Sequence, residues 1–118
     1  ADPAASFVIS ALVLFSSWPL LRDAVRVLME VAPDEPDPDA VHDALAAVDG
    51  VVDVHDLHLW TVTSGFDALT AHVRAPSRDP HALLADLRAM LRERFGLEHS
   101  TIQIEGDEPC LQDEDCGQ

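Results

Sequence analysis

Residues 51–75 read VVDVHDLHLWTVTSGFDALTAHVRA, and this stretch decides the fold. Val51 to Thr63 is rich in β-branched and apolar residues, Ser64-Gly65 is typical of a turn, and Phe66 to Ala75 alternates between apolar and polar residues. Such a pattern indicates two strands joined by a tight connection. The stretch therefore predicts a β-hairpin.

The second strand of this hairpin has two chemically different faces, because successive side chains of a strand point to opposite sides. Its apolar members are expected to point into a core and its polar members away from it. The apolar members are Leu69, Ala71 and Val73, and the polar members are Thr70, His72 and Arg74. We therefore expect His72 on the outer face of the sheet.

A short amphipathic helix is predicted before the hairpin, because apolar residues recur there at helical spacing. Asp37 is suited to cap this helix and Pro38 to occupy its first turn. Asp49-Gly50 is a strong turn signal at its end. The apolar positions of the helix are Val41, Leu45 and Val48.

A second helix and a third strand are predicted after the hairpin. The helix carries an apolar stripe and Gly96 closes it; the stripe consists of Leu83, Leu84, Leu87, Met90, Leu91 and Phe95. His99 to Glu105 forms the last strand, with Ile102 and Ile104 facing inward. The order α-β-β-α-β predicts an α+β fold, an open-faced sandwich of the ferredoxin-like (metallochaperone-like) kind. Its uncovered sheet face, which carries His72, Gln103 and Glu105, could bind metal or pack against a second copy.

The N-terminal stretch predicts a transmembrane helix. Residues 3–21 carry no charge, and nineteen helical residues span about 28 Å, near the thickness of the hydrocarbon core of a bilayer. Trp18 suits a membrane interface, and Arg22 and Arg26 place the C-terminal side in the cytoplasm. A buried helix of a soluble protein and a secretory signal are the alternatives, although Asp2 before the apolar run is atypical of a signal.

These segments divide the chain into a transmembrane helix (1–30), an acidic linker (31–37), a domain (38–108) and a polar tail (109–118) that holds Cys110 and Cys116. Because the chain opens with Ala1, we expect it to be the C-terminal portion of a longer polytopic protein, with residues 3–21 in membrane lipid. Residues 31–118 would then be cytoplasmic, where a disulfide framework is not expected.

The charge balance excludes a nucleic-acid partner. Twenty-two acidic residues oppose seven arginines, and the net charge is -15, whereas phosphate binding needs clustered basic residues. So acidic a surface fits either a salt-rich, halophile-like cytoplasm or a face that attracts cations. The sequence also lacks the His-Glu-x-x-His motif, the nucleophile elbow and the phosphate loop of hydrolytic and nucleotide-binding enzymes.

The chain resembles the cation diffusion facilitator family, in the branch of the cobalt-zinc-cadmium resistance transporters. The motifs that carry the resemblance are, in order, Asp2-Pro3, Leu28-Met29-Glu30, Ala32-Pro33, Gly50-Val51, His55-Asp56-Leu57-His58-Leu59-Trp60, Ser64-Gly65, His72-Val73 and Thr101-Ile102-Gln103-Ile104-Glu105. The resemblance implies a multi-pass membrane homodimer that exports divalent metal by proton antiport, with zinc favoured over Co²⁺ or Cd²⁺. It implies no enzyme activity. The family's transport site lies on spans that this chain does not contain.

The resemblance also implies metal ligands in the cytoplasmic domain. His55, His72, His81 and Asp107 match ligand positions of the family's binuclear site, whereas Glu105 stands where related members place a histidine. A carboxylate there can bind zinc but is a harder ligand, and we expect it to weaken the site or alter its selectivity.

The remaining histidines are not predicted to be ligands. His58 lies three residues from His55, so the two side chains reach one face only if a bulge intervenes; a structural or dimer-contact role is favoured for it. His42 and His99 are expected on solvent faces. The rival hypothesis is a purely structural dimerisation module without a functional metal site.

Overall fold

The computed structural model describes residues 2–107, and the chain separates into two compact units at the boundary between Val31 and Ala32. The first unit is helix α1 (Pro3–Leu28). Asp2 caps it, because its side-chain oxygen accepts a hydrogen bond from the amide of Ala4 at 3.0 Å. Pro19 lies within the helix, which continues past it to Leu28.

Helix α1 is long and apolar enough to cross a membrane, with a mean hydropathy of 1.9 in its most apolar window. None of its residues is buried. Two of its serine hydroxyls donate to carbonyls of the helix itself: Ser10 Oγ to Ser6 O at 2.8 Å and Ser16 Oγ to Val13 O at 3.0 Å. Hydroxyls satisfied within their own helix suit a lipid environment, where water is absent.

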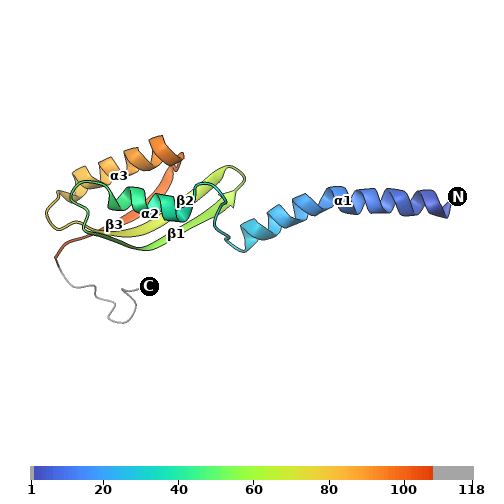
Figure 1. Cartoon of the computed structure of the whole chain (residues 1–118), viewed down its shortest axis with the longest axis horizontal. Coiled ribbons are helices and arrows are strands. Elements are labelled where there is room, and N and C mark those ends of the chain that lie inside the picture. The colour runs from blue at the N-terminus through green and yellow to red at the C-terminus, as the bar shows by residue number, and fades with distance from the viewer. Residues whose placement is uncertain (1, 108–118) are drawn as a thin grey trace. The chain divides into compact units, whose positions relative to one another are not determined.

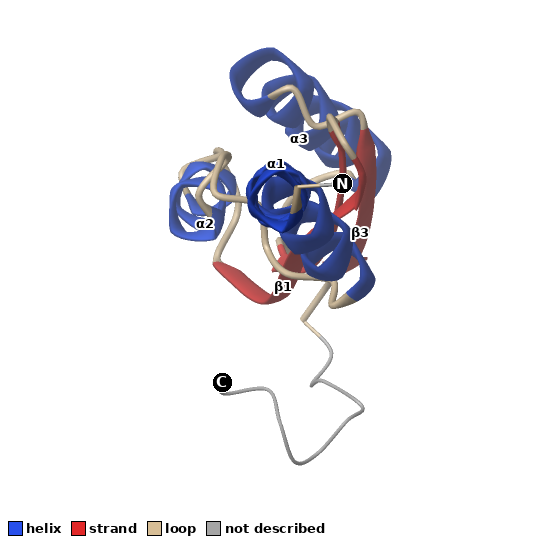
Figure 2. Cartoon of the chain, turned by 90° about the vertical axis from the view of Figure 1, so that its right-hand side faces the viewer, coloured by secondary structure: helices blue, strands red, loops and turns tan. Residues whose placement is uncertain are grey.

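The second unit has the predicted order of elements: α2 (Pro38–Ala46), β1 (Asp53–Thr63), β2 (Phe66–Arg74), α3 (Pro80–Phe95) and β3 (His99–Glu105). The strands form one mixed sheet in the order β1-β2-β3, in which β1 pairs antiparallel with β2 and β2 pairs parallel with β3. Both helices lie on the same side of this sheet (Figures 1 and 2). The predicted open-faced α+β sandwich is confirmed.

The hydrophobic core lies between the two helices and the inner face of the sheet. Its most deeply buried large side chains are Leu45, Leu69, Leu83, Leu87, Leu91, Val41 and Val73. Full burial of each such side chain contributes roughly 1.5–3 kcal/mol relative to exposure. Every residue of the core cluster falls between Val41 and Leu97, so the second unit has a complete core of its own.

The helix ends follow the sequence signals. Asp37 caps α2 through the amide of Asp39, and Gly96 ends α3 in the left-handed conformation with a φ of 69°. His42 was expected on a solvent face, and its side chain is 44% exposed, but it also makes a contact that was not predicted. This side chain on α2 is half-buried, and its Nε2 lies 3.1 Å from the carbonyl oxygen of Val54 on β1, so it joins the helix to the sheet.

Arg78 links the loop between α2 and β1 to helix α3 through hydrogen bonds. Its guanidinium donates to the carbonyl oxygen of Asp49 at 2.7 Å and to Oδ2 of Asp86 at 2.6 Å. Gly50 adopts a φ of 86°, and an added Cβ would lie 2.4 Å from Cγ of Arg78. Glycine is therefore required here both for its backbone conformation and for the space that the arginine stem fills.

Candidate metal centre

A β-bulge in β1 determines which histidines share the outer face of the sheet. His55 pairs with His72 and His58 pairs with Thr70 across the hairpin, so β1 holds one residue more than β2 in this interval. Asp56, within the bulge, has a φ of 49°. Because of the extra residue, His55 and His58 both face outward, which the spacing of three would otherwise prevent.

Three predicted ligand residues converge on this outer face, one from each strand. His55, His72 and Glu105 each offer a ligand atom within 4.8 Å of the other two. His72 Nδ1 lies 3.0 Å from Glu105 Oε1, and His55 Nε2 lies 3.4 Å from Glu105 Oε2. The parallel pairing of β2 with β3 brings Glu105 to this place, although it lies 33 positions after His72 in the sequence.

The three side chains are largely shielded from solvent. The exposed fractions are 17% for His55, 15% for Glu105 and 28% for His72. His55 Nε2 is buried and makes no hydrogen bond within the described chain. A buried polar atom without a partner requires an explanation. Here the explanation that fits the donor set is an open ligand position, because zinc binds neutral imidazole nitrogen and carboxylate oxygen.

Further polar groups surround this trio and restrain it. Asp53 Oδ2 lies 3.0 Å from His55 Nδ1, on the side of the ring away from Glu105. Gln103 Nε2 donates to Glu105 Oε1 at 3.1 Å. These contacts were not predicted. Because side chains alternate along a strand, Asp53 lies on the same face as His55, and this spacing could have predicted their contact.

The structure does not bring the other two predicted ligands into the trio. His81 is exposed in the first turn of α3, and Asp107 is exposed beyond the end of β3. His58 faces outward but is 66% exposed, and its Nε2 lies 2.9 Å from Oδ1 of Asp56. His99 is exposed, as expected, with its ring 4.5 Å from that of Phe66. Cys110 and Cys116 lie outside the described residues.

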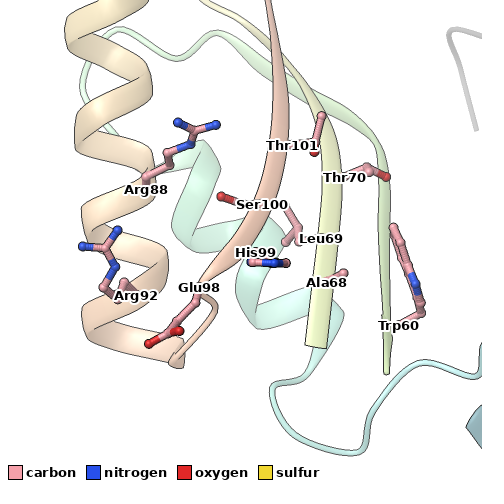
Figure 3. A pocket seen from close by; sticks show the side chains of 10 residues that line it. All are labelled: Trp60, Ala68, Leu69, Thr70, Arg88, Arg92, Glu98, His99, Ser100 and Thr101. Carbon is pink, nitrogen blue, oxygen red and sulfur yellow. The ribbon is translucent and has the colours of Figure 1, made fainter. Parts of the chain in front are cut away.

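A separate hollow lies beside the first residues of β3, and none of the predicted ligands lines it (Figure 3). Arg88 and Arg92 of α3 lie on one side of the strand, and Trp60 of β1 lies on the other. The hollow carries two arginines and a single carboxylate, from Glu98. Such a lining does not suit a divalent cation.

Residues 33–107 match the family model described as cation efflux protein, cytoplasmic domain, and the chain belongs to this family. The resemblance to cation diffusion facilitators is thereby confirmed. Among its relatives, the mouse protein named probable proton-coupled zinc antiporter SLC30A3 is 42% identical over 110 residues, which cover 92% of this chain and 28% of that protein. Human proton-coupled zinc antiporter SLC30A8 is 39% identical over 117 residues, or 98% of this chain and 31% of that protein.

A solved structure supports the same assignment. It is the metal-bound C-terminal domain of the CzcD transporter from Cuprividus metallidurans, which is 39% identical to this chain with a TM-score of 0.55. The match covers 58% of this chain and 97% of that domain. The present chain spans about a third or less of the length of the transporters named above.

Proposed function

We propose that this chain is the C-terminal part of a membrane transporter that exports divalent cations, zinc above others, by proton antiport. Residues 3–21 would lie in membrane lipid as the last span, and the domain from residue 32 onward would be cytoplasmic and homodimeric. The relatives named as zinc antiporters support this, as does a helix α1 of sufficient length and hydropathy. The transport site itself would belong to spans that lie outside this chain.

The cytoplasmic domain would bind and sense metal through His55, His72 and Glu105. The single observation that carries this proposal is the convergence of these three residues around the unpartnered, buried His55 Nε2. Two imidazoles and one carboxylate favour zinc over magnesium, which prefers oxygen ligands alone. Three protein ligands leave a fourth tetrahedral position for water or a further side chain.

A purely structural dimerisation module is the second candidate, and one observation favours it. Each of the three outer-face histidines of the hairpin already has a carboxylate neighbour: Asp53 for His55, Asp56 for His58 and Glu105 for His72. Such pairs can satisfy the imidazoles without an ion. On this hypothesis the domain would dimerise equally well with and without metal.

Calorimetric titration of the full chain in a non-ionic detergent separates the two candidates. We expect zinc to bind with a dissociation constant on the order of micromolar or tighter and near-integral stoichiometry, and magnesium at equal ionic strength to give no comparable heat. The double variant His55→Ala/His72→Ala should lose this binding. His99→Ala is the matched control, because it removes an exposed histidine of the same sheet face outside the trio.

The structural candidate would be preferred if zinc produced no specific heat, or if the double variant bound zinc as the unaltered chain does. Sedimentation velocity on the same samples gives the oligomeric state. A dimer that tightens with zinc but not with magnesium would support metal sensing. An identical dimer in both solutions would count against it.

A further inference from the structure

We propose that Asp53 is a positioning residue of the candidate metal centre: its carboxylate fixes His55 in the tautomer whose unprotonated Nε2 faces Glu105. The inference rests on the proposed function for the identity of the ion. Asp53 is not itself among the proposed ligands, and the tautomer of His55 can be measured without metal.

The geometry of β1 creates the contact. Asp53 and His55 are two residues apart on a strand, so both side chains leave the same face. Asp53 Oδ2 lies 3.0 Å from His55 Nδ1, within hydrogen-bond distance. The opposite ring nitrogen, Nε2, lies 3.4 Å from Glu105 Oε2 and has no hydrogen bond. The ring is thus hydrogen-bonded on one side only, and its other nitrogen faces Glu105 without a hydrogen bond.

The chemistry of imidazole converts this contact into a ligand preference. A neutral imidazole carries hydrogen on one nitrogen only, and an ionised carboxylate can only accept a hydrogen bond. Carboxylates face both ring nitrogens, but only Asp53, at 3.0 Å from Nδ1, is in hydrogen-bond geometry, whereas Glu105 Oε2 is 3.4 Å from Nε2 without a hydrogen bond. The hydrogen would therefore reside on Nδ1, where it is donated to Asp53, and Nε2 would keep a lone pair directed at the trio. A neutral histidine in water favours the opposite tautomer, with the hydrogen on Nε2. Asp53 would reverse that preference and so prepare Nε2 to bind metal.

The other carboxylates near the trio do not serve the same purpose. Asp56 Oδ2 is 3.7 Å from His72 Nε2, too far for a hydrogen bond, and the closer partner of Asp56 is the exposed His58. Glu105 lies on the ligand side of both rings. Arg74 stands between Asp53 and Glu105 in the strand register. Its positive charge opposes simple attraction of a cation by Asp53, which leaves orientation of the ring as the contribution of this carboxylate.

The first test is nuclear magnetic resonance of the metal-free full chain in detergent, labelled with ¹⁵N-histidine, at a pH where the imidazoles are neutral. Two-bond ¹H–¹⁵N correlations identify which ring nitrogen of each histidine carries hydrogen. We expect His55 to carry it on Nδ1 in the unaltered chain and in Asp53→Asn, whose amide oxygen still accepts. In Asp53→Ala the hydrogen should move to Nε2 or divide between the two nitrogens.

Asp43→Asn is the matched control, because Asp43 also lies beside a histidine, 3.5 Å from His42, but away from the trio. It should leave the tautomer of His55 unchanged. A His55 that keeps hydrogen on Nδ1 in Asp53→Ala would overturn the inference. So would a His55 that carries hydrogen on Nε2 in the unaltered chain.

The second test is zinc affinity measured on the same variants. Loss of a carboxylate that orients a ligand histidine typically weakens metal binding by roughly 10–100-fold, and we expect a loss of this size in Asp53→Ala. Asp53→Asn should lose clearly less, because it retains an acceptor. Equal losses in both variants would show that only the charge matters and would refute positioning. If the unaltered chain bound no zinc, the proposed function would fail, and the tautomer of His55 would still decide this inference.

Discussion

Replacement of Gly50 by alanine should destabilise the second unit by more than a positive φ alone explains. The residue has a φ of 86°, and an added Cβ would lie 2.4 Å from Cγ and 2.9 Å from Cδ of Arg78. These atoms belong to the stem of the arginine, so the whole side chain must move to admit a methyl group. Its movement would break the contacts of the guanidinium with Asp49 O and Asp86.

The expected cost has three components. Placing an L-residue in the left-handed region costs about 1–2 kcal/mol. Loss of the charge-assisted hydrogen bond to Asp49 O costs about 1.5–3 kcal/mol, and the partly exposed pair with Asp86 adds at most about 1 kcal/mol. We therefore expect Gly50→Ala to lower the free energy of unfolding by roughly 2.5–6 kcal/mol.

Urea unfolding of the segment 32–118, which has its own complete core, measures this cost. Trp60 is the only tryptophan in that segment and reports the transition by fluorescence. Gly65→Ala is the matched control: its φ is 77°, and nothing lies within 4 Å of an added Cβ. It should cost only the backbone component of about 1–2 kcal/mol.

A double-mutant cycle isolates the contribution of the arginine. In an Arg78→Ala background the stem is absent, so Gly50→Ala should cost no more than Gly65→Ala does. Equal costs for Gly50→Ala with and without Arg78 would refute the reasoning. The same conclusion would follow if Gly50→Ala and Gly65→Ala destabilised the unaltered chain equally.

Three further outcomes are expected. Leu87→Ala, which empties a fully buried position, should cost about 2–5 kcal/mol in urea unfolding, and a cost below that of an exposed site would contradict the assigned core. Asp79→Ala should cost about 1 kcal/mol by removing the cap that accepts from the amide of Ala82 at 2.8 Å; Glu93→Ala, on an exposed part of the same helix, is its control. In zinc titrations Glu105→His should bind zinc at least as tightly as the unaltered chain, because imidazole is the softer ligand. Weaker zinc binding by Glu105→His would show that the carboxylate is preferred. His58→Ala should leave the zinc affinity unchanged.

The fold could be predicted because its signals are local and mutually consistent. The alternation from Phe66 to Arg74 and the apolar stripe of α3 each specify one element and one buried face. Gly96 and Asp37 mark helix ends through backbone rules that need no tertiary information. The contact of His42 was not predicted because its partner, the carbonyl oxygen of Val54, belongs to a different element.

The candidate site could be predicted only in part from the sequence, because its geometry depends on strand pairing. The residues His55, His72 and Glu105 could be named from the resemblance, but their proximity depends on strand register. The bulge at Asp56 is an irregularity of the backbone. The β-branched and charged residues around it do not indicate where in the strand such a bulge forms. Its effect on His58 was therefore conditional on a feature that only the three-dimensional structure reveals.

Each of the three strands contributes one residue to the candidate metal centre, and this arrangement links metal binding to folding. Glu105 reaches His72 only after the chain has crossed over through α3, closing a loop of 33 residues. An ion held by the trio would act as a reversible cross-link across that loop, formed only when all three strands are paired. By mass action it would stabilise the folded domain by about 2.7 kcal/mol at a free concentration one hundred times its dissociation constant. Strand β3 would then fray less when the ion is bound than when it is absent.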